Sequence, residues 1–564
     1  MWCGSYYGYL SREDQLVFIG LWDAYPMHRK IVFAAWACQN EKYGSAQLSK
    51  ELFRKIFDEV VIFDPQKISY LHGRAEMNRM LIELVRKEQP DYLFLWLIYD
   101  EIFIDTLMKI REASPKTKLL NFFGDDDTLY KTQSRFLAPF LDGCFVVQID
   151  FLKNYRQDGI KNAYQLAGVN TEYYRPLALK KKYDVSFIGT PKSDRYKIIK
   201  FLIANGINVA VFGAGWEQYP DIQAFCKGAV SKKDLVPTIN ESKISISFTK
   251  NYEGKPHYKG RVAEICGCRS FLITEHFEGY YGLFRKNELV TFHNESDLLD
   301  SIRYYLKHED EREQIAKRAC KRVVKHLSLE KELRTAFRAL EKITPRKKDV
   351  RLQIIQKSIA YLSKEDFTKK DSEIINKIKN AAYIGFKEKD TELFPYKDYF
   401  QIESLEKSKN EISCCDYYVN SRFLGDYLAW YSQRSFNVLL SEKFHDCLRL
   451  DQLLMRRSYF LKNIEKIRSH FGGSRQEFIK KGKCSFVSIP LLRLKKFPPI
   501  DAQLLDKVSL PKYEDTLRAL WNQRILFFHP FVYALLVRSI MYNRPILRRT
   551  LQRTSDKIKQ SIFH

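Results

Sequence analysis

Two cations and a carboxylate gather at the start of a short helix predicted in the middle of the chain. The stretch reads Lys259-Gly-Arg-Val-Ala-Glu-Ile-Cys-Gly267, and a buried strand is predicted directly after it. A helix N-terminus presents unpaired N–H groups and a partial positive charge. With Lys259 and Arg261 beside it, this turn is suited to hold an anion such as a diphosphate. Glu264 lies on the same helix face as Arg261, so an ordinary surface ion pair between them is the alternative.

Two turns that follow predicted strands could add to this anion site. The residues singled out are Gly189, Lys192 and Arg195 in the first turn, Gly213, Gly215 and Trp216 in the second, and His257 and Tyr258 next to Lys259. Glycine lets a ligand approach the backbone, whereas Trp216 suits core packing as well as stacking on a ligand. The P-loop pattern GxxxxGK[ST] is absent from the sequence, and GxGxxG opens neither domain, which disfavours an NAD-dependent epimerase or dehydrogenase.

A run of carboxylates, Asp125-Asp-Asp127, follows another predicted strand. Asp126 or Asp127 could hydrogen-bond a hydroxyl group of an acceptor, and Asp126 could act as its general base. The alternative is an N-cap for the next helix, with solvated neighbours. A metal site is disfavoured, because cationic side chains are expected where a metal would otherwise neutralise a diphosphate.

Alternating strands and helices must position these residues. From residue 30 onward, β-branched or aromatic runs alternate with amphipathic stretches, the pattern of parallel sheets with crossover helices. Strands are predicted at Lys30–Trp36, Glu59–Phe63, Tyr92–Leu97, Lys118–Phe123, Gly143–Val147, Ala163–Leu166, Tyr183–Ile188, Val209–Phe212, Ile244–Phe248, Ser270–Thr274 and Leu289–Phe292. Helices are predicted at Ala46–Phe57, Gly73–Lys87, Glu101–Ala113, Lys131–Leu141, Ser193–Asn205, Lys232–Asn240, Arg261–Cys266, Ser296–Lys307, Asp310–Lys325 and Leu329–Ile343. Ligands of such sheets bind at the carboxyl ends of the strands.

The chain of 564 residues is too long for one core. A break near Pro176 predicts two tandem Rossmann-like α/β domains, residues 1–175 and 176–345, that face a cleft. Beyond Pro345 the alternation stops, and residues 346–564 are predicted to form a mainly α-helical, basic extension with helices such as Val350–Ser363 and Asp371–Ala382.

Most of the net charge of +26 lies in this C-terminal extension. Its basic clusters are interleaved with aromatic and aliphatic residues and stand at Arg456-Arg457, Lys480-Lys481, Lys495-Lys496 and Arg548-Arg549. Such a composition favours an anionic membrane surface, with nucleic acid less favoured and a solvated accessory domain as the plain alternative. The expected location is the cytoplasm, peripheral at the inner face of the cell membrane, because no apolar run is long enough to span a bilayer and charged residues interrupt any N-terminal signal.

At several of these segments the chain resembles the group 1 glycosyltransferases with the two-domain GT-B fold, and most closely their bacterial branch related to the spore-maturation protein CgeB. The matching pieces are Val185–Thr190, Val211–Trp216, Gly260–Gly267, Phe271–Glu275, Leu298–Ala319, Asn121–Asp127 and Gly168–Asn170. The resemblance implies a hexosyltransferase that uses a nucleotide-diphosphate sugar, with no metal or other cofactor, and a glycan or lipid-linked acceptor of the cell envelope or a surface polysaccharide.

The resemblance also implies roles for individual residues. Gly189, Lys192 and Arg195 would lie near the diphosphate, and Gly213 to Trp216 near the nucleoside. Arg261 would pair with phosphate, and Glu264 would contact the ribose or sugar. Many group 1 enzymes carry a second glutamate eight positions earlier, where this chain has Pro256, so the stereochemical outcome stays open. The rival reading is a catalytically inactive scaffold of the same fold, recruited to membrane or nucleic acid by its basic tail.

Overall fold

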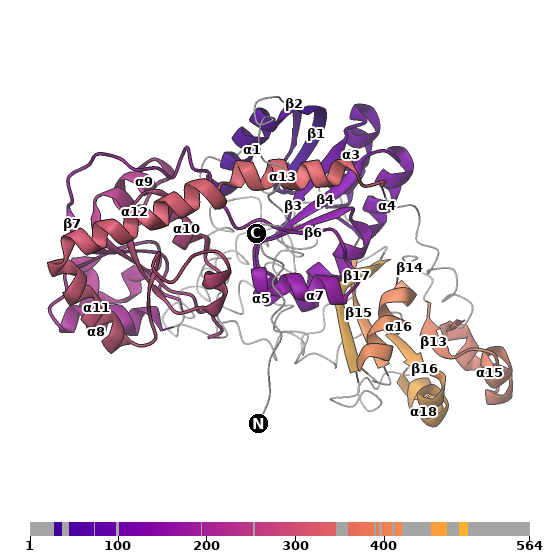
Figure 1. Cartoon of the computed structure of the whole chain (residues 1–564). Helices are drawn as coiled ribbons and strands as arrows, with labels where there is room; N and C mark the ends of the chain where they lie inside the picture. Colours follow the sequence, from indigo (N-terminus) through magenta and orange to yellow (C-terminus); the bar gives the residue numbers. More distant parts are fainter. Residues whose placement is uncertain are drawn as a thin grey trace, which may run out of the picture.

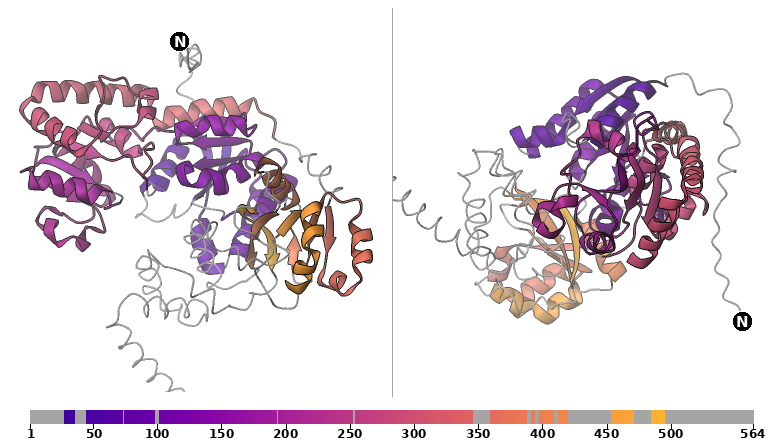
Figure 2. Two further views of the ribbon diagram at one scale, coloured as in Figure 1. Left: turned by 90° about the horizontal axis from the view of Figure 1, so that it is seen from below. Right: turned by 90° about the vertical axis from the view of Figure 1, so that its left-hand side faces the viewer.

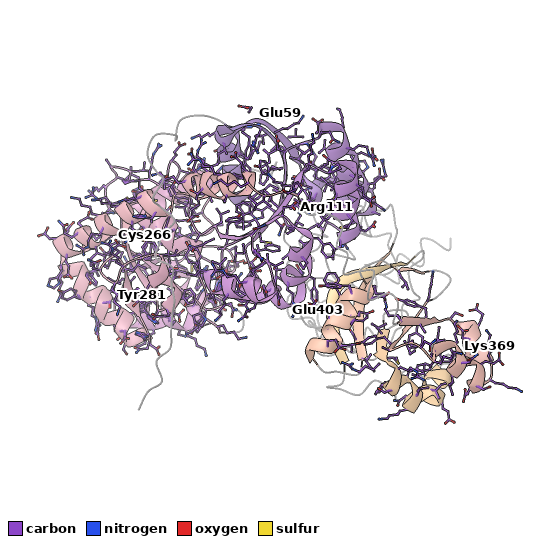
Figure 3. The ribbon with its side chains drawn as sticks, turned by 45° about the vertical axis from the view of Figure 1, so that its right-hand side comes forward. Glu59, Arg111, Cys266, Tyr281, Lys369 and Glu403 are labelled. Carbon is purple, nitrogen blue, oxygen red and sulfur yellow. The ribbon has the colours of Figure 1, made fainter. Side chains whose placement is uncertain are left out.

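The computed structural model describes the three predicted regions to different extents. The described residues are 27–35, 44–72, 74–97, 101–192, 194–251, 254–345, 359–387, 391–393, 397–408, 412–419, 453–470 and 484–494. Figure 1 shows them as three domains, with the third domain beside the first and away from the second, and the left view of Figure 2 shows the same order from below. Arg111, Cys266 and Lys369 mark the first, second and third domain in Figure 3.

The first domain is built on a parallel sheet with strand order β2-β1-β3-β4-β5-β6. Its strands are β1 (Met27–Ala35), β2 (Phe57–Phe63), β3 (Tyr92–Trp96), β4 (Lys118–Phe123), β5 (Gly143–Val146) and β6 (Ala163–Gln165). Its longer helices are α1 (Gly44–Ile56), α2 (Pro65–His72), α3 (Arg74–Glu88), α4 (Ile104–Ala113) and α7 (Leu152–Gln157). The strands predicted here are confirmed within a few residues, because helices cover both faces of the sheet and the strands are correspondingly apolar on both.

The segment after β4 is not the single helix predicted over Lys131–Leu141. It consists of α5 (Asp126–Leu129), a π-helical turn (Tyr130–Ser134), α6 (Arg135–Leu137) and a 3-10 turn (Ala138–Phe140). Pro139 lies in the last of these turns, where its missing N–H needs no helical partner. A π-helical turn inside a helix often marks a functional segment, and this one directly follows the carboxylate run.

The second domain is a smaller parallel sheet with strand order β11-β10-β9-β7-β8. Its strands are β7 (Tyr183–Ile188), β8 (Val209–Phe212), β9 (Ser242–Ser247), β10 (Phe271–Glu275) and β11 (Val290–Phe292). Its helices are α8 (Arg195–Ala204), α9 (Lys232–Asn240), α10 (Gly260–Gly267), α11 (Glu295–Lys307) and α12 (Glu309–His326). The two parallel sheets confirm the pair of Rossmann-like α/β domains predicted from the alternation.

Helix α13 (Leu329–Glu341) follows the second domain in sequence but packs on the first. Figure 1 shows α12 and α13 running in line from one domain to the other. Phe337 is fully buried among aromatic residues of the first sheet, with its ring 4.9 Å from that of Phe57 and 5.0 Å from that of Tyr92. The predicted boundary at residue 345 therefore assigns α13 to the second domain, although its contacts belong to the first.

Two chain segments cross between these domains side by side. Val169 N–H donates to the carbonyl of Leu327 at 2.9 Å, and Leu329 N–H donates to the carbonyl of Val169 at 2.9 Å. Gly168 is required here, because a Cβ at this position would lie 2.6 Å from the Leu327 oxygen. The crossing is thus one paired unit of backbone.

The third domain is the described part of the C-terminal extension, and it contains a sheet where a mainly helical extension was expected. Its described residues form a mixed sheet with strand order β12-β13-β16-β15-β17-β14. The strands are β12 (Ile359–Leu362), β13 (Tyr383–Phe386), β14 (Thr391–Leu393), β15 (Ile412–Val419), β16 (Leu453–Arg456) and β17 (Cys484–Leu494), and the helices are α15 (Asp371–Ile378), α16 (Lys397–Ser408) and α18 (Arg457–His470). The helix predicted at Asp371–Ala382 is confirmed as α15, whereas the end of the helix predicted at Val350–Ser363 is strand β12.

Helix α16 attaches the third domain to the first. Phe400 is fully buried in the core of the first domain, and its ring lies 5.4 Å from that of Phe136 and 5.7 Å from that of Phe140. Both partners belong to the irregular segment that begins with the carboxylate run. Of the predicted basic clusters, only Arg456-Arg457 lies within the described residues. In the described part of the chain, no helix combines the length and apolarity that a membrane crossing requires.

Candidate active site

The two glycine turns of the second domain interlock through their backbones. Gly189 follows β7, and its carbonyl accepts a hydrogen bond from Trp216 Nε1 at 2.7 Å. Gly213 follows β8 with φ +141°, and a Cβ there would lie 2.1 Å from the Gly189 oxygen. Gly215 also has a positive φ, of +89°. Glycine is therefore needed for the close approach of these two turns, which form one surface at the carboxyl ends of neighbouring strands.

Trp216 supports these turns from behind. Its side chain is 2% exposed and packs edge-on against Phe187, with ring centroids 5.9 Å apart. The predicted contact between Trp216 and a ligand is corrected on this ground, because the indole ring is enclosed in the domain core. Its indole N–H fixes the turn that carries Gly189.

Arg195 provides a fixed positive charge at the start of α8. Its side chain is mostly buried, it donates from Nη1 to the Thr190 carbonyl at 3.1 Å, and its guanidinium lies 5.7 Å from the Phe187 ring centroid. Lys192 is exposed in the same turn. A cation held by packing and a backbone hydrogen bond needs no reorganisation to stabilise a nearby anion.

His257 and Lys259 bring further positive charge to the same place. Lys259 Nζ contacts His257 Nε2, and His257 is 5% exposed. Burial, with the positive charge of Arg195 and then of Lys192, lowers the pKa of Lys259 to about 8. Burial and the charge of Lys259 lower the pKa of His257. Arg195 and Lys192 thus each lie within electrostatic reach of Lys259, as expected for cations that bind one anion.

The carboxylate run of the first domain meets these cations across the domain junction. Asp127 Oδ2 accepts a hydrogen bond from Asn251 Nδ2 at 3.0 Å and lies 3.8 Å from His257 Nε2. Asp125 is exposed and lies within electrostatic reach of Lys259 and Lys192. The ends of β4 and β9 thus bring opposite charges together at one point between the domains.

Asp126 points away from this junction, which corrects its predicted role as general base. It is 1% exposed, and Tyr155 Oη donates to its carboxylate oxygens at 3.0 and 3.2 Å. Burial raises the pKa of Asp126 to about 7, against hydrogen bonds from Ser134 and Tyr155 that lower it. A carboxylate enclosed in the core of its own domain cannot touch an acceptor, so Asp127, which was also predicted on the acceptor side, remains a candidate and Asp125 joins it.

Arg261 and Glu264 pair with each other on α10, as the plain alternative anticipated. Arg261 Nη1 lies 2.6 Å from Glu264 Oε2, and both side chains are partly buried. Tyr173 and Tyr174, in the segment that leaves the first domain, lie within electrostatic reach of both. Lys192 and Arg195 therefore lie near a third cation, but that cation is Lys259 and not the predicted Arg261. The guanidinium of Arg261 instead pairs with Glu264, near Tyr173 and Tyr174.

Tyr258 is a structural residue of the junction. It is 2% exposed, and its hydroxyl donates to the Ala167 carbonyl at 2.6 Å. The predicted contact between Tyr258 and the donor is corrected for this reason: the ring is buried against Tyr280, with centroids 6.0 Å apart. Its backbone, by contrast, lies where the two domains touch.

Several residues of the site could not be anticipated from the sequence. Lys250 Nζ lies 2.7 Å from Asp194 Oδ2 and 2.8 Å from Glu275 Oε1, so it joins the loops after β7, β9 and β10. Glu275 Oε2 also accepts from the Thr249 N–H at 2.9 Å. Glu275 directly follows the strand predicted at Ser270–Thr274, and this position was the available signal. Asn251 and Gln148, by contrast, stand in no recognisable spacing.

The described residues hold no group of three or more His, Cys, Asp or Glu side chains arranged to bind a metal ion. That the site works without a metal ion, as the sequence resemblance implies, stays a prediction.

Comparison with known proteins adds one assignment. Residues 195–338 match the family model described as glycosyl transferase-like. This region spans the second domain from α8 onward together with most of α13. A search of curated proteins finds no match to the chain.

Solved structures with a similar arrangement include three proteins of low sequence identity. Sucrose-phosphate synthase from Thermosynechococcus elongatus is 10% identical with a TM-score of 0.41, over 56% of this chain and 99% of that one. Anabaena Alr3699/HepE in complex with UDP and glucose is 12% identical with a TM-score of 0.41, over 56% and 100%. A glycosyltransferase from Rickettsia africae is 13% identical with a TM-score of 0.40, over 56% and 98%. A similarity of this degree concerns the path of the backbone and carries no information on the reaction.

Proposed function

We propose that this protein is a glycosyltransferase that moves a sugar from a nucleotide-diphosphate sugar to a hydroxyl group of an acceptor. The observation that carries the proposal is the meeting of Lys192, Arg195 and Lys259 with Asp125 and Asp127 at the carboxyl ends of the two parallel sheets. The glycosyl transferase-like match over residues 195–338 supports the same reading of the second domain.

The cations would act on the leaving group. When the bond between the sugar C1 and the diphosphate oxygen breaks, negative charge grows on the diphosphate, and fixed positive charges stabilise it. Lys259 and Lys192 would contact the phosphates. The more deeply buried Arg195 would add to the positive electrostatic potential at the phosphates without touching them. The backbone N–H groups at the start of α10 would add to this stabilisation.

Asp127 would act on the acceptor. The acceptor oxygen forms the new bond to C1, and its proton must leave; Asp127 is held by Asn251 in a position to accept it. The acceptor class in this proposal is a glycan or lipid-linked molecule of the cell envelope or a surface polysaccharide. Attachment to the inner face of a membrane through the basic C-terminal region belongs to the proposal as well, because most of that region lies outside the described residues.

Arg261 and Glu264 would serve the nucleoside end of the donor. They lie on the first turns of α10, directly after Lys259, and their ion pair is partly open to solvent. We expect Glu264 to accept hydrogen bonds from the ribose hydroxyls, with Arg261 keeping its carboxylate in place.

The experiment is a transfer assay with a panel of nucleotide sugars, combined with calorimetric binding of the nucleoside diphosphates. We expect one donor to be used, and Lys259→Met to lower its turnover by about 100- to 1,000-fold, the typical loss for a group that stabilises developing charge. Asp127→Asn should lower transfer while binding of the diphosphate persists.

Two controls separate these effects from general damage. Lys243→Ala removes an exposed cation of the same domain that pairs with Asp184, and Asp126→Asn changes the buried neighbour of Asp127 but leaves the hydrogen bond from Tyr155 possible. Both should retain transfer. If the unchanged protein binds no nucleoside diphosphate and transfers no sugar, the proposal is wrong, and the inactive scaffold becomes the better account.

A further inference from the structure

Gln148 joins the two loops that carry the opposite charges of the site. It follows β5 in the first domain and is 2% exposed. Its Oε1 accepts from the Tyr258 N–H at 3.0 Å, and its Nε2 donates to the Tyr258 carbonyl at 3.2 Å and to the Gly124 carbonyl at 3.4 Å. One amide therefore connects the residue before Asp125 with the residue before Lys259.

The hydrogen bonds of Gln148 all go to backbone atoms, which makes the connection geometric. The backbone N–H and carbonyl of Tyr258 are both bound by one planar amide, much as a neighbouring strand would bind them. Asparagine would be one methylene too short to reach them, and glutamate would place an acceptor where a donor is needed. The contacts of Asp127 with Asn251 and His257 also connect these loops, but they join side chains and leave the backbone free to shift.

We propose that Gln148 is a positioning residue that sets the spacing between the carboxylate loop of the first domain and the cation loop of the second. This inference rests on the proposed function. With the spacing fixed, an acceptor hydroxyl held at Asp127 and a donor held at Lys259 meet at reacting distance. Without it, each loop keeps its own residues, but their alignment across the junction is lost.

The consequence is a separation of binding from turnover. The cations that would hold the diphosphate all belong to the second domain, so its affinity should not depend on Gln148. Transfer needs the donor on the second domain and the acceptor on the first domain to be aligned. A misplacement of about 1 Å at a reacting centre can cost about 100-fold in rate.

The kinetic test compares Gln148→Leu and Gln148→Glu with Gln165→Leu. Gln165 lies on β6, the next strand of the same sheet, and its buried Nε2 has no hydrogen-bond partner, so leucine removes no such bond there. We expect both Gln148 variants to lose about 10- to 100-fold in turnover with less than a twofold change in diphosphate affinity, and Gln165→Leu to behave like the unchanged protein. Full turnover in Gln148→Leu, or an equal loss of affinity and turnover, overturns the inference.

A second readout needs neither donor nor acceptor. Hydrogen–deuterium exchange measures the Tyr258 N–H, which loses its partner in Gln148→Leu. We expect exchange of a peptide that spans residues 254–260 to speed up at least tenfold, with strands β4 and β10 unchanged, and no such effect in Gln165→Leu. Unchanged exchange in Gln148→Leu contradicts the connection itself. If the protein proves not to be a transferase, this measurement still decides whether Gln148 couples the loops.

Discussion

Among the cations proposed to hold the diphosphate, Lys259 is the residue whose charge changes within the range of pH near 8. Its pKa is lowered to about 8 by burial and then by Arg195, while Asp127 opposes the shift. Because the folded-state pKa lies below the usual value for lysine, the ammonium form is complete only below about pH 7. A diphosphate favours that charged form and would raise the pKa again on binding.

The affinity for nucleoside diphosphate should therefore fall as the pH rises through about 8. Calorimetric titration at several values between about pH 7 and 9.5 measures this change, which is expected to approach tenfold for each unit above the pKa of the free protein. In Lys259→Met the affinity should be lower at neutral pH and nearly constant over the same range. A wild-type affinity that does not change between these values contradicts the placement of Lys259 at the diphosphate.

Sequence reasoning found the residues whose type and position already imply a charge site. Lys259 stands at a predicted helix start, and the carboxylate run follows a predicted strand, so both were recognisable. Which aspartate faces the junction was not, because the turn geometry that directs Asp126 onto Tyr155 depends on the π-helical segment after it. Gln148 and Asn251 act through tertiary contacts with distant backbone or side chains, which leave no local pattern.

At the scale of elements, the two glycine turns behave as one part. Gly213 has a positive φ and touches the Gly189 carbonyl, and that carbonyl also receives the Trp216 indole N–H. Neither turn can change its course without moving the other. The surface that the two turns form, where we propose that the donor binds, therefore depends on the absence of a single Cβ.

Gly213→Ala should destabilise the protein and abolish binding of the nucleoside diphosphate. The new Cβ would lie 2.1 Å from the Gly189 oxygen, so the turns must separate. Gly206→Ala is the matched control, because Gly206 also has a positive φ, of +81°, but its Cβ would meet no atom within 4 Å. Thermal unfolding should show an additional loss of about 1 to 3 kcal/mol for Gly213→Ala, the usual cost of overpacking. Equal unfolding and equal affinity in the two variants would refute the interlock.

The predictability of elements followed their burial. The parallel strands of the first two domains are apolar on both faces and were found within a few residues. The helix after β4 was misjudged, since helical periodicity does not reveal a π-helical turn. The sheet of the third domain was missed because its strands are short or far apart in sequence: β15 ends at Val419, and its neighbour β16 begins at Leu453.

At the scale of the whole molecule, the third domain contacts the segment that begins with the carboxylate run, which we propose faces the acceptor. Phe400 of α16 packs on Phe136 and Phe140, within the segment that starts at the carboxylate run. The extension is thus joined to the first domain by a buried contact. Removing this contact should loosen the segment that holds Asp127.

Phe400→Ala should cost about 3 to 5 kcal/mol of stability, as large-to-small changes of buried aromatic residues do. Ile375→Ala, on α15 of the same domain, is the control because Ile375 is 42% exposed. Urea unfolding measures the stability, and hydrogen exchange of residues 126–140 should rise in Phe400→Ala alone. If this segment stays as protected as in the control, the third domain does not support it.

The return of α13 to the first sheet has a consequence for how the molecule is made. As the ribosome releases the chain from its N-terminus, the strands of the first sheet emerge long before Phe337, which closes the aromatic core above them. The part of that core that α13 covers lacks its covering helix until the second domain has been synthesised. A chaperone that shields apolar surface during translation would therefore be needed most in the interval before residue 341 leaves the exit tunnel.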